Sequence, residues 1–321
     1  MGGWLQWGID QIVAVQAGGN QLLTQTMESF TFLGAELFYM LVMPAVLWCF
    51  SASLGIRLGL ALLLSAGMNA VLKLALGLPR PFWVDARIGA LSIETSFGLP
   101  SGHAQNAVVL WSYLAYQVRR WWALLAALFL IAAISFSRIY LGMHFPADVV
   151  AGWIVGGAIL ALFLALERPI TRWLKQRGLA GRIGMAVLFS FGLLGLGWLA
   201  AQSAAGKGLA PEWAANFHRA IGAAIPFAPA SLEDIVAGAG AFLGFSVGAI
   251  LLDDWGRFTN GRGAWPRLAR FFVGLVGVLA LQLGLNTLLP EGEAFRFARY
   301  SLLGWWISYG APRAFMALRL T

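Results

Sequence analysis

Residues 137–148, SRIYLGMHFPAD, bring an arginine, a histidine and an aspartate together between two long apolar stretches. Charged side chains beside a membrane segment are costly and usually serve a function. Arg138 closes the first stretch, and Pro146 suits the first position of a new helix. Asp148 then follows His144 by about one helical turn, close enough to hold its imidazole ring. The stretch predicts two membrane helices whose neighbouring ends carry a polar site.

The composition of the whole chain indicates a membrane protein. Its 321 residues are 60% hydrophobic and 11% charged, whereas soluble domains carry about 25% charged residues. The net charge of +8 could suggest nucleic acid, but the basic residues gather in short loops between apolar stretches, as in cytoplasmic anchors. The single cysteine, Cys49, rules out an internal disulfide. We therefore expect the membrane, and no nucleic acid, as a partner.

Nine stretches are expected to be transmembrane helices of an all-α, polytopic membrane helix bundle. They lie near residues 33–52, 55–78, 101–118, 121–139, 147–166, 183–202, 235–252, 271–289 and 300–317. Residues 1–32 are too polar to span and are expected to lie along the membrane interface. Residues 33–166 hold the three polar motifs and form the expected core bundle, and residues 167–321 supply additional transmembrane helices.

Basic residues predict the orientation of the bundle. They concentrate in residues 119–120, 167–182 and 253–270, and the last region includes Arg257 and Arg262. All three regions can be cytoplasmic if the N-terminus is outside and the C-terminus inside. We therefore expect the protein in the cell inner (plasma) membrane, with residues 137–148 facing the periplasm or the exterior.

The segment KLALGLPRP, residues 73–81, would lie on the same outer face. Lys73 and Arg80 are seven residues apart and would share one face of a continuous helix. Pro79 and Pro81 break that helix and would turn Arg80 over the mouth of the bundle. Basic residues are depleted on the outer side of membranes, so two of them close together on that side indicate a functional site.

The segment PSGH, residues 100–103, is the third outer-face segment. Ser101 suits the N-cap of a helix. The N–H groups of Gly102 and His103 would then point outward at the start of that helix. Free N–H groups at a helix N-terminus bind anions.

Together the three segments predict a phosphate site. Arginine forks suit phosphate oxygens, and backbone N–H groups complete such a cradle. One alternative is a metal held by His103, His144 and Asp148, although three nearby cations would repel a divalent ion. Another alternative is that Lys73 snorkels and the arginines contact lipid headgroups. We expect no metal and no cofactor.

The same segments resemble a known family. Residues 73–81, 100–103 and 137–148 are similar to the signature of the type 2 phosphatidic acid phosphatase superfamily, and the resemblance covers about residues 73–153. The superfamily includes lipid phosphate phosphatases, bacterial acid phosphatases and vanadium haloperoxidases. The stretch SRIYLGMH and the additional C-terminal helices are also similar to the sphingosine 1-phosphate phosphatase branch.

The resemblance implies a role for each motif residue. His144 would be the nucleophile that forms a phosphohistidine, and Asp148 would orient it. His103 would protonate the leaving alcohol and then activate water. The phosphate oxygens would be bound by Lys73, Arg80, Ser101, Gly102 and Arg138.

The sequence therefore predicts a membrane enzyme that removes phosphate from a lipid phosphate monoester or diphosphate. A lipid phosphotransferase using the same histidines and aspartate is the first alternative. A lipid transporter is the second, although its charges would be expected at the membrane midplane rather than at helix ends. A haloperoxidase is a poor match to so hydrophobic a chain, and a homo-oligomer is left open.

Two other features have simpler interpretations. Gly240, Gly244 and Gly248 form a stripe that predicts a close contact between helices. The loop of residues 82–99, which includes Glu94, would lie over the proposed site and could shape substrate choice.

Overall fold

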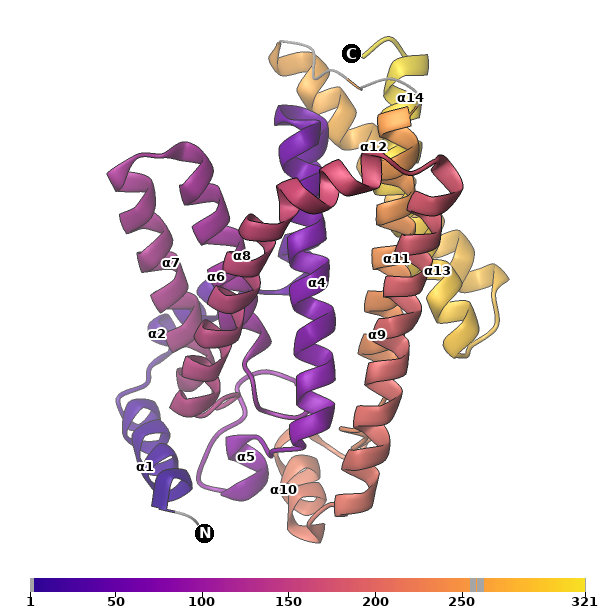
Figure 1. The fold of residues 1–321 in the computed structure, drawn as a ribbon. Helices are drawn as coiled ribbons and strands as arrows, with labels where there is room; N and C mark the ends of the chain where they lie inside the picture. The colour runs from indigo at the N-terminus through magenta and orange to yellow at the C-terminus, as the bar shows by residue number, and fades with distance from the viewer. Residues whose placement is uncertain (1–2, 255–257, 259–262, 321) are drawn as a thin grey trace. The chain divides into compact units, whose positions relative to one another are not determined.

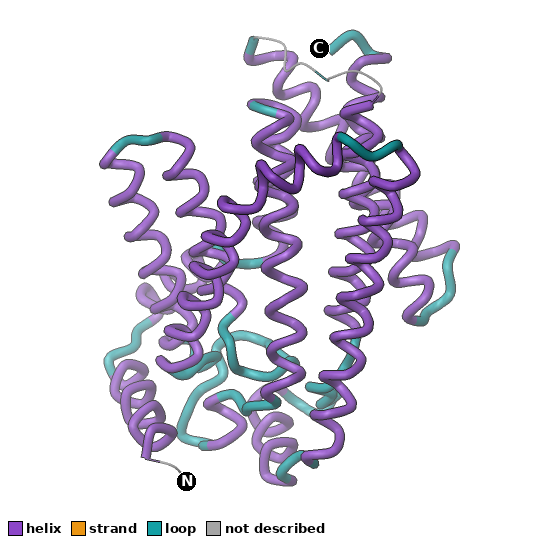
Figure 2. Tube along the Cα trace, viewed as in Figure 1, coloured by secondary structure: helices purple, strands orange, loops and turns teal. Residues whose placement is uncertain are grey.

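The computed structural model describes residues 3–254, 258 and 263–320, and Arg257 and Arg262 lie outside this part. Its regular elements are all helices, drawn as coiled ribbons in Figure 1 and in purple in Figure 2. They are α1 (Gly3–Ala17), α2 (Gln21–Phe32), α3 (Glu36–Ala45), the π-helical η1 (Val46–Phe50), α4 (Ala52–Leu76), α5 (Pro81–Val84), α6 (Gly102–Val118), α7 (Trp121–Tyr140), α8 (Pro146–Lys175), α9 (Leu179–Lys207), α10 (Pro211–Ile221), α11 (Glu233–Asp254), α12 (Ala264–Leu288), α13 (Glu293–Trp305), the π-helical η2 (Trp306–Gly310) and α14 (Ala311–Ala317).

Six segments of the described chain are long and apolar enough to cross a membrane. They are Ala52–Val84, Trp121–Tyr140, Pro146–Lys175, Leu179–Gly206, Glu233–Asp254 and Ala264–Leu288. The bent pair Gln21–Phe32 and Glu36–Phe50 would raise the count to seven. The all-helical membrane architecture expected from the sequence is therefore confirmed.

The two remaining predicted spans are also helical, but they are shorter or divided. Residues 101–118 form α6, which has 17 residues, and residues 300–317 are divided among α13, η2 and α14. Neither is among the six candidate spans. The count of nine spans, the orientation of the bundle, the division at residues 32 and 166 and the interfacial position of residues 1–32 stay predictions.

The described chain forms two compact units. Unit 1 comprises residues 1–38, 68–161 and 197–232, and unit 2 comprises residues 39–67, 162–196 and 233–321. In unit 1, α7 is packed against α2 and α6, and α10 is packed against α5. All of the predicted site residues lie in unit 1.

The turn between α7 and α8 has the position that the sequence predicts. Helix α8 begins at Pro146, as predicted. Gly142 has a positive φ of 75°, a conformation that glycine adopts without the Cβ penalty of other residues. A Cβ at Gly142 would also meet the Gly89 carbonyl oxygen. The turn is therefore tight and seated against the loop that joins α5 to α6.

Helix α1 holds that loop from the other side. The Gln16 amide donates to the carbonyl oxygens of Gly89 and Tyr140, each at 2.9 Å, and it accepts a hydrogen bond of 2.9 Å from the Gly89 N–H. A single side chain thus ties the N-terminal segment, the α5–α6 loop and the end of α7 together. The N-terminal segment is part of the scaffold of unit 1.

In unit 2, the glycine stripe makes the predicted close helix contact. A Cβ at Gly240 would lie 2.5 Å from the carbonyl oxygen of Phe297 on α13. A Cβ at Gly244 would collide with the Ser301 carbonyl oxygen, and one at Gly248 with the Ser308 hydroxyl. Small residues permit this approach of backbones within a membrane.

We expect Gly244→Ala to lower the thermal stability of the protein in detergent, because its methyl group must push α11 away from α13. Overpacking of this kind costs about 1–3 kcal/mol. Gly238→Ala on the same helix is the matched control, since a Cβ there would meet no atom of the described residues within 4 Å. Heating followed by size-exclusion chromatography measures the folded fraction, and an equal loss in both variants would argue against the close contact.

Candidate active site

The three predicted segments converge in unit 1 at neighbouring helix ends. Lys73 lies in the last turn of α4 and Arg138 in the last turn of α7. Asp148 lies in the first turn of α8, and His144 lies in the turn just before it. Ser101 occupies the N-cap of α6. The site is therefore built where helices begin and end, as the sequence predicts.

Arg80 lies at the centre of this arrangement and is fully buried, with 0% exposure. Its Nε donates to the Ser96 carbonyl oxygen at 2.6 Å, and Nη1 donates to the Met143 carbonyl oxygen at 3.1 Å. Nη2 donates to Glu94, to the Ser96 hydroxyl and to the Phe97 carbonyl oxygen. These hydrogen bonds offset much of the cost of removing the guanidinium from water.

The predicted alignment of Lys73 with Arg80 on one helix is wrong, because α4 ends at Leu76. The two cations are brought together by Ser96 instead. Lys73 Nζ donates to the Ser96 hydroxyl at 2.9 Å, and Arg80 Nη2 reaches the same oxygen at 3.2 Å. Sequence reasoning missed Ser96, since a serine in an irregular loop carries no periodic signal.

Glu94 bridges the two arginines. Its Oε2 lies 3.3 Å from Arg80 Nη2, and its Oε1 lies 2.6 Å from Arg138 Nη2. Burial alone would raise the pKa of the Glu94 carboxyl, but the positive charges of Arg80 and Arg138 lower it below its ordinary value. Glu94 is therefore an ionised carboxylate, held between guanidinium groups where an anion is expected to bind.

The second amino group of the Arg138 guanidinium is also hydrogen-bonded. Its side chain is 1% exposed, and Nη1 donates to the Thr31 hydroxyl of α2 at 2.7 Å. Thr31 lies in the segment that the sequence predicts as interfacial, more than a hundred residues away. The position of this arginine thus depends on packing between α2 and α7, which no local pattern reveals.

His144 is buried at 1% exposure, and its Nε2 lies 3.3 Å from Arg80 Nη1. A guanidinium can only donate, so Nε2 is the acceptor and Nδ1 carries the hydrogen of the neutral ring. Burial lowers the pKa of His144 well below its ordinary value, and the charges of Arg80 and Arg138 lower it further. The ring is therefore neutral at neutral pH, with the Nε2 lone pair facing the arginine cradle.

Asp148 lies on the opposite side of the imidazole ring. Its Oδ2 is 3.4 Å from His144 Nδ1, longer than a well-formed hydrogen bond. The same oxygen accepts a 2.9 Å hydrogen bond from the Phe145 N–H. The Asp148 carbonyl oxygen accepts a bond of 3.0 Å from the Ser101 N–H, which joins α8 to the start of α6. The predicted proximity of Asp148 to His144 is thus present.

The PSGH segment opens α6 as expected, although the Ser101 side chain does not cap the helix. The Ser101 hydroxyl is buried and has no hydrogen-bond partner among the described residues. At Gly102 a Cβ would come within 3.0 Å of the Asn69 amide oxygen. Asn69 in turn donates to the Pro100 carbonyl oxygen at 3.2 Å and to the Gln105 side chain at 2.9 Å. This polar pair, which sequence reasoning missed, fixes the segment against α4.

His103 lies in the first turn of α6, and its ring faces the turn between α2 and α3. A Cβ at Gly34 would be 3.1 Å from His103 Cδ2. In the described part of the chain, no hydrogen bond to the His103 ring is found.

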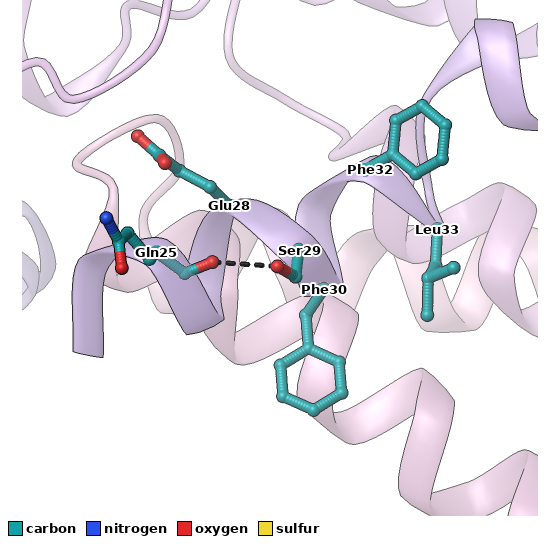
Figure 3. A pocket seen from close by; sticks show the side chains of 6 residues that line it. All are labelled: Gln25, Glu28, Ser29, Phe30, Phe32 and Leu33. Carbon is teal, nitrogen blue, oxygen red and sulfur yellow. Dashed lines mark hydrogen bonds between the residues drawn. The ribbon is translucent and has the colours of Figure 1, made fainter. Parts of the chain in front are cut away.

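Among the described residues, no group of three or more histidine, cysteine, aspartate or glutamate side chains is arranged to hold a metal ion. The absence of a metal requirement stays a prediction. A hollow of about 700 Å³ lies along α2, with Gln25, Glu28, Ser29, Phe30, Phe32 and Leu33 as its lining (Figure 3). None of the predicted site residues lines it.

Comparison with known proteins gives the following matches. Residues 54–172 match the family model for the PAP2 superfamily, and residues 236–321 match the model for the transmembrane extension of PAP2 superfamily phosphatases. The chain is 30% identical to a probable sphingosine-1-phosphate phosphatase of Dictyostelium discoideum over 45% of this chain and 38% of that protein. It is 26% identical to lipid phosphate phosphatase delta of Arabidopsis thaliana over 53% of this chain and 44% of that protein.

A bacterial relative matches over more of its length. The chain is 29% identical to phosphatidylglycerophosphatase B of Bacillus subtilis over 48% of this chain and 80% of that protein. The chain spans less than half the length of the Dictyostelium and Arabidopsis relatives. These matches confirm the resemblance seen in the sequence, including the distant similarity to sphingosine-1-phosphate phosphatases.

Proposed function

The chain belongs to the PAP2 superfamily, and from this premise we propose that it hydrolyses a lipid phosphate monoester or diphosphate without a metal ion. The observation that carries the proposal is the placement of His144. Its Nε2 lies 3.3 Å from Arg80 Nη1, and the same guanidinium shares a carboxylate with Arg138. A neutral nucleophile thus lies at the edge of a cationic cradle.

In the first step the His144 Nε2 lone pair attacks phosphorus. The bond from phosphorus to the alcohol oxygen breaks, and His103 donates the proton that the leaving alcohol needs. In the second step His103 takes a proton from water, whose oxygen attacks the phosphohistidine, and the phosphorus–nitrogen bond breaks. The products are inorganic phosphate and the alcohol, or the lipid monophosphate where the substrate is a diphosphate, and both histidines return to their starting state.

Asp148 supports the nucleophile in this scheme. Attack through Nε2 places positive charge on the imidazole ring, and the carboxylate 3.4 Å from Nδ1 stabilises it. The Phe145 N–H holds that carboxylate in place. The same carboxylate favours the tautomer that carries the hydrogen on Nδ1 and the lone pair on Nε2.

The negative charge of the transition state falls on the three equatorial oxygens of the transferred group. Lys73, Arg80 and Arg138 supply positive charge there. The N–H group of Gly102 and the Ser101 hydroxyl, which has no hydrogen-bond partner among the described residues, supply further donors. Phosphoryl transfer relies mainly on such positioning and electrostatics. The cations perform the neutralisation that metal ions provide in other phosphatases.

A lipid substrate is supported by where the site lies. The motif residues are at helix ends, next to segments that can cross a membrane, so a phosphate at the membrane surface can reach them while its chains stay in the bilayer. The names of two relatives refer to lipid phosphates. A lipid phosphotransferase remains the alternative, because an alcohol could replace water in the second step.

We expect activity to persist in excess chelator, because Lys73, Arg80 and Arg138 hold the phosphate. Phosphate release from a panel of lipid phosphates by purified protein, measured with and without EDTA, checks this. Orthovanadate, which mimics five-coordinate phosphorus, should inhibit. Loss of activity in EDTA that Mg²⁺ or Zn²⁺ restores would rule out the proposed cradle.

The two histidines should fail differently. His144→Ala removes the nucleophile, so turnover and phosphoenzyme formation should both be abolished. His103→Ala should slow both steps, since general acid–base catalysis contributes about 10²–10⁴-fold. With an aryl phosphate whose leaving group needs no proton, the first step should partly recover and an acid-labile phosphoenzyme should accumulate.

Substrate-dependent labelling with ³²P provides the measurement for both histidines. The comparison between an alkyl and an aryl phosphate is the internal control, because only the alkyl substrate needs the proton from His103. Label in His144→Ala combined with none in His103→Ala would reverse the two assignments.

The basic loops imply that the site faces the periplasm or the exterior. Ile93 is 62% exposed in the loop that carries Glu94, so Ile93→Cys in a Cys49→Ser background should react with an impermeant thiol reagent in intact cells or spheroplasts. Gln176→Cys, in the basic connection after α8, is the matched control and should react only after the membrane is opened. The opposite pattern would invert the orientation.

A further inference from the structure

The Glu94 carboxylate occupies the position between Arg80 and Arg138 that the proposed phosphate needs. One oxygen contacts each guanidinium, at 3.3 Å and 2.6 Å. Both arginine side chains are essentially buried, whereas the Glu94 side chain is 23% exposed. Arginine forks recognise carboxylates and phosphates through the same donors, so the two anions compete for one place.

The arginines can keep their positions when Glu94 leaves. Arg80 is held by the carbonyl oxygens of Ser96, Met143 and Phe97. Arg138 is held by the Thr31 hydroxyl. Glu94 is therefore not the only group that orients the cradle, and its departure would leave two pre-positioned guanidinium groups.

The chain around Glu94 is also suited to move. Backbone hydrogen bonds from Leu91 to Leu141 and from Gly98 to Leu78 fix the two sides of the segment, at 3.1 Å and 2.9 Å. Among the described residues, no backbone–backbone hydrogen bond involves residues 92–95. The neighbouring Ile93 is 62% exposed and so contributes little packing. Glu94 can therefore swing out while the loop keeps its attachments.

From these contacts we infer that Glu94 is an internal competitor for phosphate, which yields the cradle to the substrate and returns to expel inorganic phosphate after hydrolysis. This inference rests on the proposed function and adds a step of product release to it. A tethered anion is present at high effective concentration, so it raises the apparent dissociation constant of every phosphate ligand by the same factor. The gain is that the strongly cationic site does not retain its product.

The test is titration of the purified full-length protein with inorganic phosphate by calorimetry, combined with product-inhibition kinetics. Glu94→Gln keeps the size of the side chain but removes the competing charge. We expect it to bind inorganic phosphate about tenfold or more tightly, the factor usual for one charge-assisted contact. The inhibition constant should fall by the same factor, and release should become the slow step, so that an initial burst precedes a lower steady rate.

Asp85→Asn is the matched control. Asp85 is a carboxylate at the start of the same loop, paired with Arg87 rather than with the cradle, so its removal changes the charge of the loop equally. The phosphate affinity of Asp85→Asn should stay within about twofold of that of wild type. If Asp85→Asn and Glu94→Gln both bound phosphate more tightly by the same factor, the cause would be long-range attraction, and the inference would be wrong. Glu94→Ala, which cannot form a new hydrogen bond, should shift the affinity in the same direction as Glu94→Gln.

If Glu94 instead served only to position the arginines, both Glu94 variants would bind phosphate more weakly than wild type or equally well, and the inference would be wrong. It would also be wrong if wild type and variants all failed to bind. If wild type bound phosphate and Glu94→Gln tightened that binding, while no lipid phosphate was hydrolysed, the proposed function would fail and the competition would stand. If wild type hydrolysed lipid phosphates but Glu94→Gln bound phosphate no more tightly, the proposed function would stand and the competition by Glu94 would be wrong.

Discussion

The buried guanidinium of Arg80 is the constraint on which the rest of the site depends. A cation removed from water must find acceptors for its donors or destabilise the fold. Arg80 finds them in the α5–α6 loop, in the turn before α8 and in the His144 ring. Satisfying this one side chain therefore draws all of these segments to one end of unit 1.

Much of this could be predicted from residue spacing. His144 and Asp148 are four residues apart at the start of a helix, Pro146 fixes where that helix begins, and each observation needs only local geometry. The glycines of α11 likewise predict a close helix contact from their spacing alone. Such features can be predicted because the residues that interact are spaced by about one helical turn in the sequence.

Other parts of the site could not be predicted, because they depend on tertiary packing. Ser96 lies in a loop without periodicity, and Thr31 comes from a helix distant in sequence from Arg138. The sequence places the loop of Glu94 over the site but does not predict its ion pairs with the two arginines. The expected alignment of Lys73 with Arg80 fails for a related reason. The helix ends at Leu76, before the prolines, and the alignment assumed that it continued. Because the helix ends a few residues before Arg80, loop contacts and not helical spacing decide where that side chain lies.

Stability is a poor explanation for the charges of unit 1. Buried ion pairs are often no more stabilising than apolar residues of the same size, whereas removing one partner is strongly destabilising. A bundle that needed only to fold could close these helix ends with apolar side chains. Unit 1 instead holds Arg80, Arg138 and Glu94 in a balance of charge that no apolar substitution could reproduce. In the proposed function, this balance of charge lets the phosphate of the substrate replace the Glu94 carboxylate between the two arginines.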